Sequence, residues 1–298
     1  MSELLAPITP SELQRELDGL EPIGRVGNLE IHIIDGDAFP ATLMEIGRIR
    51  ESVFREVGAG RGVDCDLDEL DRGPLAYRQL LVWDPEHLEL VAMYRYQLAA
   101  RSQTHGDQLL RTSRLFDYSP TFRRDYLPWS IELGRSVVNP DARRRRQGFF
   151  ALWSGLGAVL RSHPEIRYYF GNVSLYRNMP EAAQQATVAF LESSYAAPAP
   201  LLTAKAGLRY RPQGPDAEAA GRSEPPDNPR GRIKALRALL SQHDGQIPPI
   251  LQSYMGLGLG IYFGETALDR DFGDALEVGI VVPIKSIGSD ILERFVNS

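Results

Sequence analysis

The stretch from Ser130 to Phe150, SIELGRSVVNPDARRRRQGFF, joins a strand-like segment to a helix-like one, and the rest of the chain is interpreted around it. An apolar-rich run over Ser130–Val138 predicts a strand, and apolar residues at helical spacing from Gly148 to Ser162 predict a helix. Four arginines and a glycine stand where the helix begins. Because a helix N-terminus carries partial positive charge and free N–H groups, this junction is suited to an anion.

A carboxylate, Glu132, stands inside the predicted strand. Period-two alternation places Glu132 and Gly134 on one face and Arg135 on the other, unless a bulge intervenes. A charged group in an apolar strand is costly to bury unless it is paired or used. Two interpretations stay open: an internal ion pair with another strand, or a general base that takes a proton from an amine.

The basic junction also allows two interpretations. Glycine at a strand-to-helix turn lets backbone N–H groups approach a bound anion, and neighbouring arginines can clamp a phosphate with two hydrogen bonds each. The alternative is a solvated basic turn. The residues concerned are Arg143, Arg144, Arg145, Arg146, Gln147 and Gly148.

Composition narrows the class of protein. The chain has 298 residues and a net charge of −6, which disfavours non-specific nucleic-acid binding because that binding neutralises phosphates. A single cysteine, Cys65, excludes an internal disulfide and fits a reducing compartment. The N-terminus has no signal-peptide pattern, and no apolar run reaches the ~18 residues of a membrane span. We therefore expect a cytoplasmic protein, with at most a peripheral membrane contact.

The order of elements predicts a mixed α/β fold. A polar helix with Ser11 as its N-cap is expected first, followed by a strand, a helix and two paired strands before residue 130. After the helix that starts at Gly148 come a strand, a helix, and a final helix–helix–strand segment from residue 232 to about 287. The expected segments are 1–26 (N-terminal helical), 27–210 (core), 211–231 (flexible loop, with almost no apolar residue) and 232–298 (C-terminal extension packed on the core).

Several motifs in chain order resemble the GNAT superfamily of acyltransferases. Within it, the chain resembles the bacterial ornithine-lipid N-acyltransferases, often labelled hemolysin-like, and more distantly the acyl-homoserine-lactone synthases. IPPILQSYMGLGLGIYFGETALDRDFGDALEVGIVV resembles the tail of the amino-acid-acylating group, which the lactone synthases lack. The other matching residues are Arg50 and Phe54 in a helix, Asp68 and Asp71 in an acidic loop, Arg95 in a strand, and Glu132 and Arg135 in a Glu-x-x-Arg strand.

The resemblance implies a GNAT-like mixed sheet flanked by helices, with a C-terminal extension. It implies an N-acyltransferase that moves a long-chain acyl group, with or without a 3-hydroxyl, from acyl-ACP or acyl-CoA to the α-amine of an amino acid, which makes a lipid precursor. Glu132 would be the base in the Glu132–Arg135 motif, and backbone N–H groups near Val137 and Val138 would form the oxyanion hole. Donor binding would fall to Gly148, Gln147 and the arginines before them, which would hold the phosphopantetheine end of the thioester. Acyl carrier protein is acidic, so Arg143–Arg146 are its expected docking patch.

Arg50, Phe54, Asp68, Asp71 and Arg95 would form the acceptor side of the site. A solvated acidic turn or a metal site are alternatives for the acidic loop, but the EF-hand pattern is missing and we expect no metal and no permanently bound cofactor. We predict at least one contact under about 4 Å between these arginines and Asp68 or Asp71.

The sequence differs from the GNAT pattern at one position, and three other functions are alternatives to this interpretation. Phe150 occupies a position where ordinary GNAT enzymes have a small residue, which favours a carrier-protein donor over acetyl-CoA. The rivals are a homoserine-lactone synthase using S-adenosylmethionine, an acetyl-CoA-dependent N-acetyltransferase, and a non-enzymatic lipid-binding protein.

Overall fold

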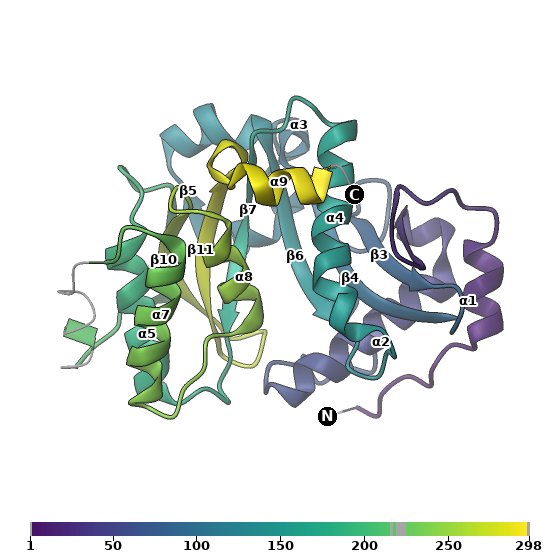
Figure 1. The fold of residues 1–298 in the computed structure, drawn as a ribbon, viewed down its shortest axis with the longest axis horizontal. Helices are drawn as coiled ribbons and strands as arrows, with labels where there is room; N and C mark the ends of the chain where they lie inside the picture. The colour runs from purple at the N-terminus through teal and green to yellow at the C-terminus, as the bar shows by residue number, and fades with distance from the viewer. Residues whose placement is uncertain (1, 215–216, 219–224, 297–298) are drawn as a thin grey trace. The chain divides into compact units, whose positions relative to one another are not determined.

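The computed structural model describes residues 2–214, 217–218 and 225–296, and Figure 1 shows its ribbon. The chain divides into two compact units that alternate along the sequence. Unit 1 comprises Met1–Leu98, Glu132–Ile166 and Ser289–Ser298, and unit 2 comprises Ala99–Ile131 and Arg167–Gly288. The segment boundaries expected from composition, after residues 26, 210 and 231, follow chain order and stay predictions.

Unit 1 holds a sheet with strand order β1-β2-β3-β4-β6, in which the first four strands are antiparallel to their neighbours. Its strands are β1 (Gly24–Val26), β2 (Leu29–Ile34), β3 (Arg78–Asp84), β4 (Glu89–Leu98) and β6 (Ser130–Val138, in this unit from Glu132). Its helices are α1 (Pro10–Leu17), α2 (Pro40–Glu56), α4 (Gly148–Ser162) and α9 (Ser289–Val296), with short 3-10 turns η1 (Gly36–Ala38) and η7 (Arg145–Gln147).

Helix α4 covers one face of this sheet, as Figure 1 shows for β3 and β4. The approach is close because α4 presents Gly155 to the sheet: a Cβ at Gly155 would lie 2.9 Å from both Ile31 Cγ2 and Leu80 Cδ1. Ile31 and Leu80 are fully buried, so this contact forms part of the unit's core. Helix α9 packs on α4, which returns the end of the chain to unit 1.

Unit 2 holds an antiparallel sheet with strand order β7-β11-β10-β9 and a two-stranded sheet of β5 and β8. Its strands are β5 (Phe116–Tyr118), β7 (Tyr168–Leu175), β8 (Leu202–Ala204), β9 (Arg209–Tyr210), β10 (Tyr262–Asp269) and β11 (Ala275–Pro283). Among the described residues, its helices include α3 (Ser102–His105), α5 (Glu181–Ser194), α7 (Pro229–Ser241) and α8 (Pro249–Leu257). Short turns are η2 (Ala99–Arg101), η3 (Asp107–Leu109), η4 (Arg111–Arg114), the π-helix η5 (Phe122–Tyr126), η6 (Leu127–Trp129) and η8 (Ile284–Ser286).

Three local expectations were wrong in detail. The first helix is capped by Thr9, whose hydroxyl accepts from the Glu12 N–H at 3.3 Å, with Pro10 at its first position, so Ser11 is not the cap. The last segment contains two strands, β10 and β11, because Gly273 (φ 63°) and Asp274 (φ 55°) adopt the left-handed conformation that closes a hairpin. Helix α7 begins at Pro229, inside the expected loop.

The expected flexible loop at 211–231 is only partly described. Asn228 caps α7 by accepting the Gly231 N–H at 2.7 Å, and this side-chain cap explains why the helix starts where it does. Residues 215–216 and 219–224 lie outside the described part of the chain. The mobility of this loop therefore stays a prediction.

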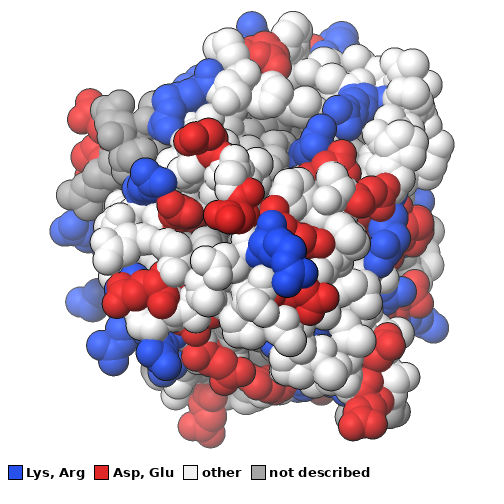
Figure 2. Space-filling model, turned by 90° about the vertical axis from the view of Figure 1, so that its right-hand side faces the viewer, with Lys and Arg blue, Asp and Glu red and all other residues white. Residues whose placement is uncertain are grey.

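The surface and the helices bear on two further expectations. Figure 2 shows acidic and basic side chains interspersed over much of one face, so the net charge of −6 is not gathered there into one patch. Within the described ranges, no helix combines the length and apolar character needed to cross a bilayer.

Candidate active site

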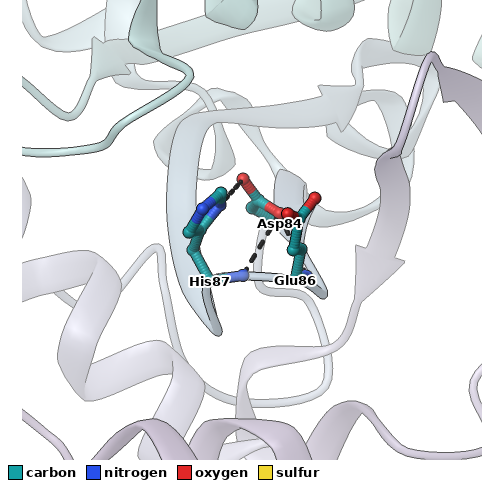
Figure 3. A group of neighbouring side chains, drawn as sticks. All are labelled: Asp84, Glu86 and His87. Carbon is teal, nitrogen blue, oxygen red and sulfur yellow. Dashed lines mark hydrogen bonds and ion pairs between the residues drawn. The ribbon is translucent and has the colours of Figure 1, made fainter.

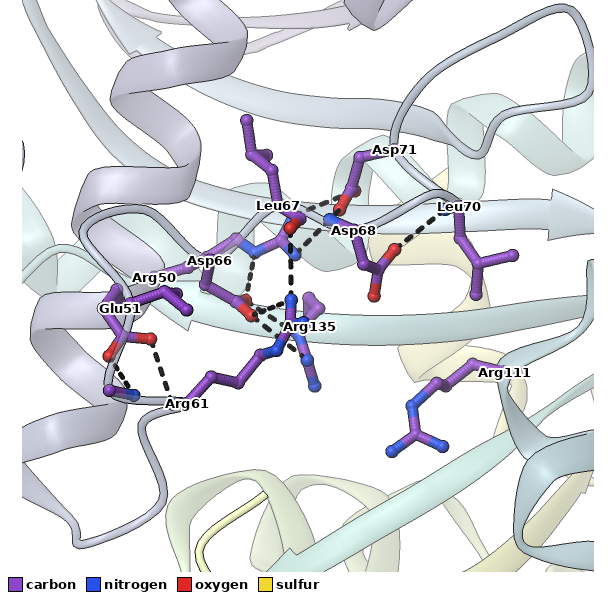
Figure 4. A network of polar contacts seen from close by, with 12 residues as sticks. Arg50, Glu51, Arg61, Asp66, Leu67, Asp68, Leu70, Asp71, Arg111 and Arg135 are labelled. Atoms are coloured by element: carbon purple, nitrogen blue, oxygen red, sulfur yellow. Dashed lines mark hydrogen bonds and ion pairs between the residues drawn. The ribbon is translucent and has the colours of Figure 1, made fainter. Parts of the chain in front are cut away.

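A buried network of charges forms in unit 1, where α2, the loop before β3, β4 and β6 meet (Figure 4). Its members are Arg50, Asp66, Asp68, Asp71, Arg95 and Arg135. Arg50 and Arg95 are each 1% exposed, which is rare for arginine and requires paired carboxylates.

The predicted arginine–carboxylate contacts are confirmed. Arg50 lies 3.1 Å from Asp71 (Nη1 to Oδ1), and Arg95 lies 2.8 Å from Asp71 (Nη1 to Oδ2) and 2.9 Å from Asp68 (Nη1 to Oδ1). Asp71 therefore bridges the two arginines. Arg50 also donates from Nε to Asp66 at 2.9 Å, and Asp66 is a partner that the sequence analysis did not single out.

Electrostatics keep these carboxylates charged. Burial alone would raise the pKa of Asp66, but the guanidinium groups of Arg135 and Arg50 outweigh it and hold that pKa at about 2. Burial acts in the same direction on Asp71, and Arg50 with Arg95 lowers the pKa of its carboxyl far below the usual range. The lowered pKa values keep the Asp66 and Asp71 carboxylates ionised near neutral pH, where they balance the charges of the buried arginines.

The loop that carries these acids is fastened to α2 by Glu51, whose side chain is fully buried. Glu51 accepts the backbone N–H groups of Arg61 at 3.1 Å and Gly62 at 2.9 Å. Asp68 then closes a local turn by accepting from Leu70 N at 2.9 Å. The acidic loop is thus an ordered wall of unit 1, and its carboxylates already have arginine cations as counter-charges.

Glu132 lies on β6 with 1% of its surface exposed. The Tyr77 hydroxyl donates a hydrogen bond to Glu132 Oε2, and the Arg95 guanidinium carbon lies 5.0 Å from the centre of the Tyr77 ring. Sequence reasoning missed Tyr77, because nothing in the local pattern distinguishes it from a core aromatic residue. The Tyr77 hydroxyl therefore holds the candidate base, and the Tyr77 ring contacts the guanidinium of Arg95, a member of the charge network.

Arg135 has an unusual backbone conformation for a strand residue. Its φ is +56°, a left-handed conformation within a strand, and its Nε lies 2.8 Å from Asp66 Oδ2. The guanidinium also lies 5.4 Å from the centre of the Phe54 ring. With this backbone conformation, Arg135 joins the same charge network, in which Arg95 contacts the ring of Tyr77 and Tyr77 bonds Glu132.

The four consecutive arginines divide into two kinds. Arg144 is only partly exposed, and it lies 3.1 Å from Asp84 (Nη1 to Oδ1) and also pairs with Glu86, in the turn between β3 and β4. Figure 3 shows Asp84 and Glu86 gathered with His87, whose Nδ1 lies 2.8 Å from Asp84 Oδ2. The arginine supplies a cation to this acidic group, and the contact fastens the basic turn to the sheet.

The other residues of the basic turn face solvent. Arg143, Arg145, Arg146 and Gln147 are exposed, and Phe150 keeps 42% of its surface.

Gly148 is buried at the start of α4. A Cβ there would lie 3.0 Å from Val138 Cγ1 and 3.2 Å from Ala92 Cβ, so a larger residue would have to displace these neighbours slightly where the helix begins against the strand end. Val137 is buried and Val138 is half-buried beside it. Roles in donor binding and as an oxyanion hole stay predictions for these residues.

The chain is similar to a known protein family and to two named proteins. The family model described as acetyltransferase (GNAT) domain matches residues 49–154. A protein of Phocaeicola vulgatus named glycine N(alpha)-acyltransferase is 32% identical, over 100% of this chain and 94% of its own length. A protein of Bacteroides thetaiotaomicron with the same name is 32% identical, over 97% of this chain and 88% of its own length.

Two solved structures of acyl-homoserine-lactone synthases resemble the chain weakly. LasI is 14% identical, covering 49% of this chain and 72% of its own, with a TM-score of 0.33. BjaI is 12% identical, covering 90% of this chain and 87% of its own, with a TM-score of 0.39. The end-to-end match with the two relatives, together with the domain match, shows that this chain is an acyl-transferring enzyme and belongs to the GNAT acyltransferase family that includes them.

Proposed function

We propose that the enzyme moves a long-chain acyl group from a thioester to the α-amine of an amino acid, which yields an N-acyl amino acid. The observation that carries this proposal is the Glu132 carboxylate, buried in β6 and bonded by Tyr77. A buried carboxylate beside a polar wall is suited to removing a proton from an amine nucleophile. The names of the two full-length relatives supply the amine class and make glycine the first acceptor to test.

The proposed reaction needs no covalent enzyme intermediate. The amine nitrogen attacks the thioester carbonyl, and its proton passes to Glu132 directly or through one water. The C–N bond forms, the tetrahedral intermediate collapses, the C–S bond breaks, and the thiolate leaves and takes up a proton. Backbone N–H groups near Val137 and Val138 would stabilise the oxyanion, a contribution of roughly 10²–10³ in rate per donor.

The charge network supports this chemistry by holding the base still. Arg95 contacts the ring of Tyr77, and Tyr77 donates to Glu132, so a shift in the acidic loop would be felt at the base. Loop residues Asp68 and Asp71 are paired to Arg95. We propose that this ordered wall forms the acceptor side of the site.

The donor is proposed to be acyl-ACP or acyl-CoA, with the exposed arginines as the docking surface for an acidic carrier protein. Arg143, Arg145 and Arg146 are the exposed cations of the run, whereas Arg144 is held by the sheet. Exposed charges of one sign accelerate encounter with a partner of opposite sign, and salt weakens that effect. Membership of the ornithine-lipid branch would make ornithine the second acceptor to test.

The test is a product assay by mass spectrometry with palmitoyl-ACP and palmitoyl-CoA, each with glycine, ornithine, lysine or glutamine. We expect an N-palmitoyl amino acid from the native enzyme and almost none from Glu132→Gln. Glu45→Gln is the matched control, because Glu45 is also a buried carboxylate of unit 1 but pairs with Arg48 outside the network. Failure of the native enzyme to acylate any of the four amino acids, with either donor, would overturn the proposal.

A further inference from the structure

Unit 2 contains a pocket of about 550 Å³ that the proposed chemistry does not use. Its volume lies within the roughly 300–1,000 Å³ of small-molecule sites. The walls are largely apolar and include Ala197, Leu202, Tyr262, Phe263 and Val281. Such walls suit a hydrocarbon chain, because burying the chain removes apolar surface from water.

The pocket is built by close approach of two segments. The segment after α5 lies along β10, where Phe263 N donates to Tyr195 O at 3.0 Å. Gly264 has no side chain, and a Cβ there would lie 2.9 Å from Leu202 O, so a larger residue would push the wall apart. Strand β10 also shifts its register against β11 between Phe263 and Thr266. These backbone features shape the pocket without any ligand.

Charged side chains at the rim of the pocket differ in their ion-pair and hydrogen-bond partners. Arg209 Nε lies 3.0 Å from Glu265 Oε2, which also accepts Ala204 N at 2.9 Å, so this pair is internally matched. Arg211 lines the same pocket and is exposed, and within the described residues it makes no hydrogen bond or ion pair. Partial desolvation and the neighbouring Glu265 raise the pKa of Glu192, the remaining acid of the lining, whereas Arg211 opposes that shift.

We propose that this pocket binds one long-chain amphiphile with a carboxylate head, its chain against the apolar walls and its carboxylate on Arg211. The apolar lining selects the chain, and Arg211 offers the planar, two-pronged donor that a carboxylate fits. A fatty acid and an N-acyl amino acid share this chemistry. The N-acyl amino acid is the product of the proposed function. Choosing it as a ligand rests on the proposed function, whereas choosing a fatty acid does not.

Calorimetric titration of the full-length chain tests this with palmitate, N-palmitoylglycine and the neutral N-palmitoylethanolamine, all below their micelle concentrations. We expect saturable one-to-one binding that is tighter for the carboxylates than for the neutral ligand. Arg211→Ala should weaken the carboxylates about tenfold and leave the neutral ligand nearly unchanged. Shortening the chain by two carbons should weaken binding by roughly tenfold.

A variant that fills the pocket supplies a second, independent test of the proposed binding site. Ala199 lines the pocket and is exposed, so Ala199→Trp should occupy it without disturbing the core and should weaken all three ligands at least tenfold. The matched controls are Ala238→Trp and Arg230→Ala, exposed α7 residues of the same unit that do not line this pocket. Glu192→Gln should tighten the carboxylate ligands, because it removes a like charge from the rim.

The outcomes separate the two proposals. Binding of both carboxylates supports a general acyl-carboxylate site, and binding of N-palmitoylglycine alone supports a product site. Unchanged binding in both Arg211→Ala and Ala199→Trp, or absence of binding by the native chain, overturns the inference. Amino-acid acylation that fails while pocket binding persists would remove the proposed function and leave the pocket's ligand class intact.

Discussion

The Tyr77 hydroxyl donates a hydrogen bond to the Glu132 carboxylate across 55 residues of sequence. Both side chains are buried, each with 1% of its surface exposed. The Tyr77 hydroxyl is a neutral donor, and its hydrogen bond helps to orient the carboxylate of the candidate base. Close to this pair, Arg50 and Arg95 form ion pairs with Asp66, Asp68 and Asp71.

Replacing the base Glu132 and replacing its hydrogen-bond donor Tyr77 should change kcat and the pH–rate profile differently. Glu132→Gln keeps the shape and should lower kcat by roughly 10²–10⁴-fold. Tyr77→Phe removes the hydrogen bond to the charged carboxylate, so we expect a smaller fall in kcat and an acidic limb of the pH–rate profile displaced to higher pH. In the Glu132→Gln background, Tyr77→Phe should cost little more. Additive losses in steady-state kinetics of the double variant would contradict this arrangement.

Breaking a buried ion pair should destabilise unit 1 more than breaking an exposed one. Arg50→Ala leaves the Asp66 and Asp71 carboxylates without one partner, so the free energy of unfolding should fall by about 3–5 kcal/mol. Arg25→Ala removes the exposed pair with Glu30 and should cost under about 1 kcal/mol. Urea denaturation followed by circular dichroism measures both, and equal losses would show that burial does not amplify the Arg50 contacts.

Acid should unfold the protein through the same carboxylates. The folded-state pKa of Asp66 is depressed from 3.8 to about 2, so its carboxylate stabilises the fold at pH values above about 4. That contribution, roughly 2 kcal/mol, is lost as pH falls from 4 through 2, because the unfolded chain binds the proton first. Asp66→Asn should flatten this part of the stability–pH curve. An unchanged slope between pH 4 and 2 would assign acid unfolding to other groups.

The arginine run should separate into docking and structural residues. Arg143→Ala with Arg146→Ala should raise KM for acyl-ACP about tenfold at low salt, with a smaller effect at high salt and on acyl-CoA. Arg144→Ala should act mainly on stability, because it leaves Asp84 and Glu86 without their cation. Kinetics at two ionic strengths test the division. Identical KM values for acyl-ACP in the native enzyme and the double variant at low salt would show that Arg143 and Arg146 belong to a solvated turn that does not dock the carrier protein.

Much of the fold and part of the site could be predicted from the chain itself. Hydrophobic periodicity is local, so the strand β6 and the helix α4 were expected at Ser130–Val138 and Gly148–Ser162, and the structure has them there. At least one contact between Arg50 or Arg95 and Asp68 or Asp71 was also expected, because a buried arginine requires a carboxylate and the acidic loop lies between their elements.

Only the tertiary structure decided which partner each charge takes. Asp66 pairs with Arg50 and Arg135, and Arg144 turns to the sheet while its neighbours face solvent, although local sequence distinguishes none of them. The left-handed backbone conformation of Arg135 accompanies its contacts with Asp66 and Phe54, residues far away in the sequence that local periodicity does not identify. Element type follows from short-range periodicity, whereas the pairing of buried charges depends on which distant segments the packed chain brings within about 4 Å.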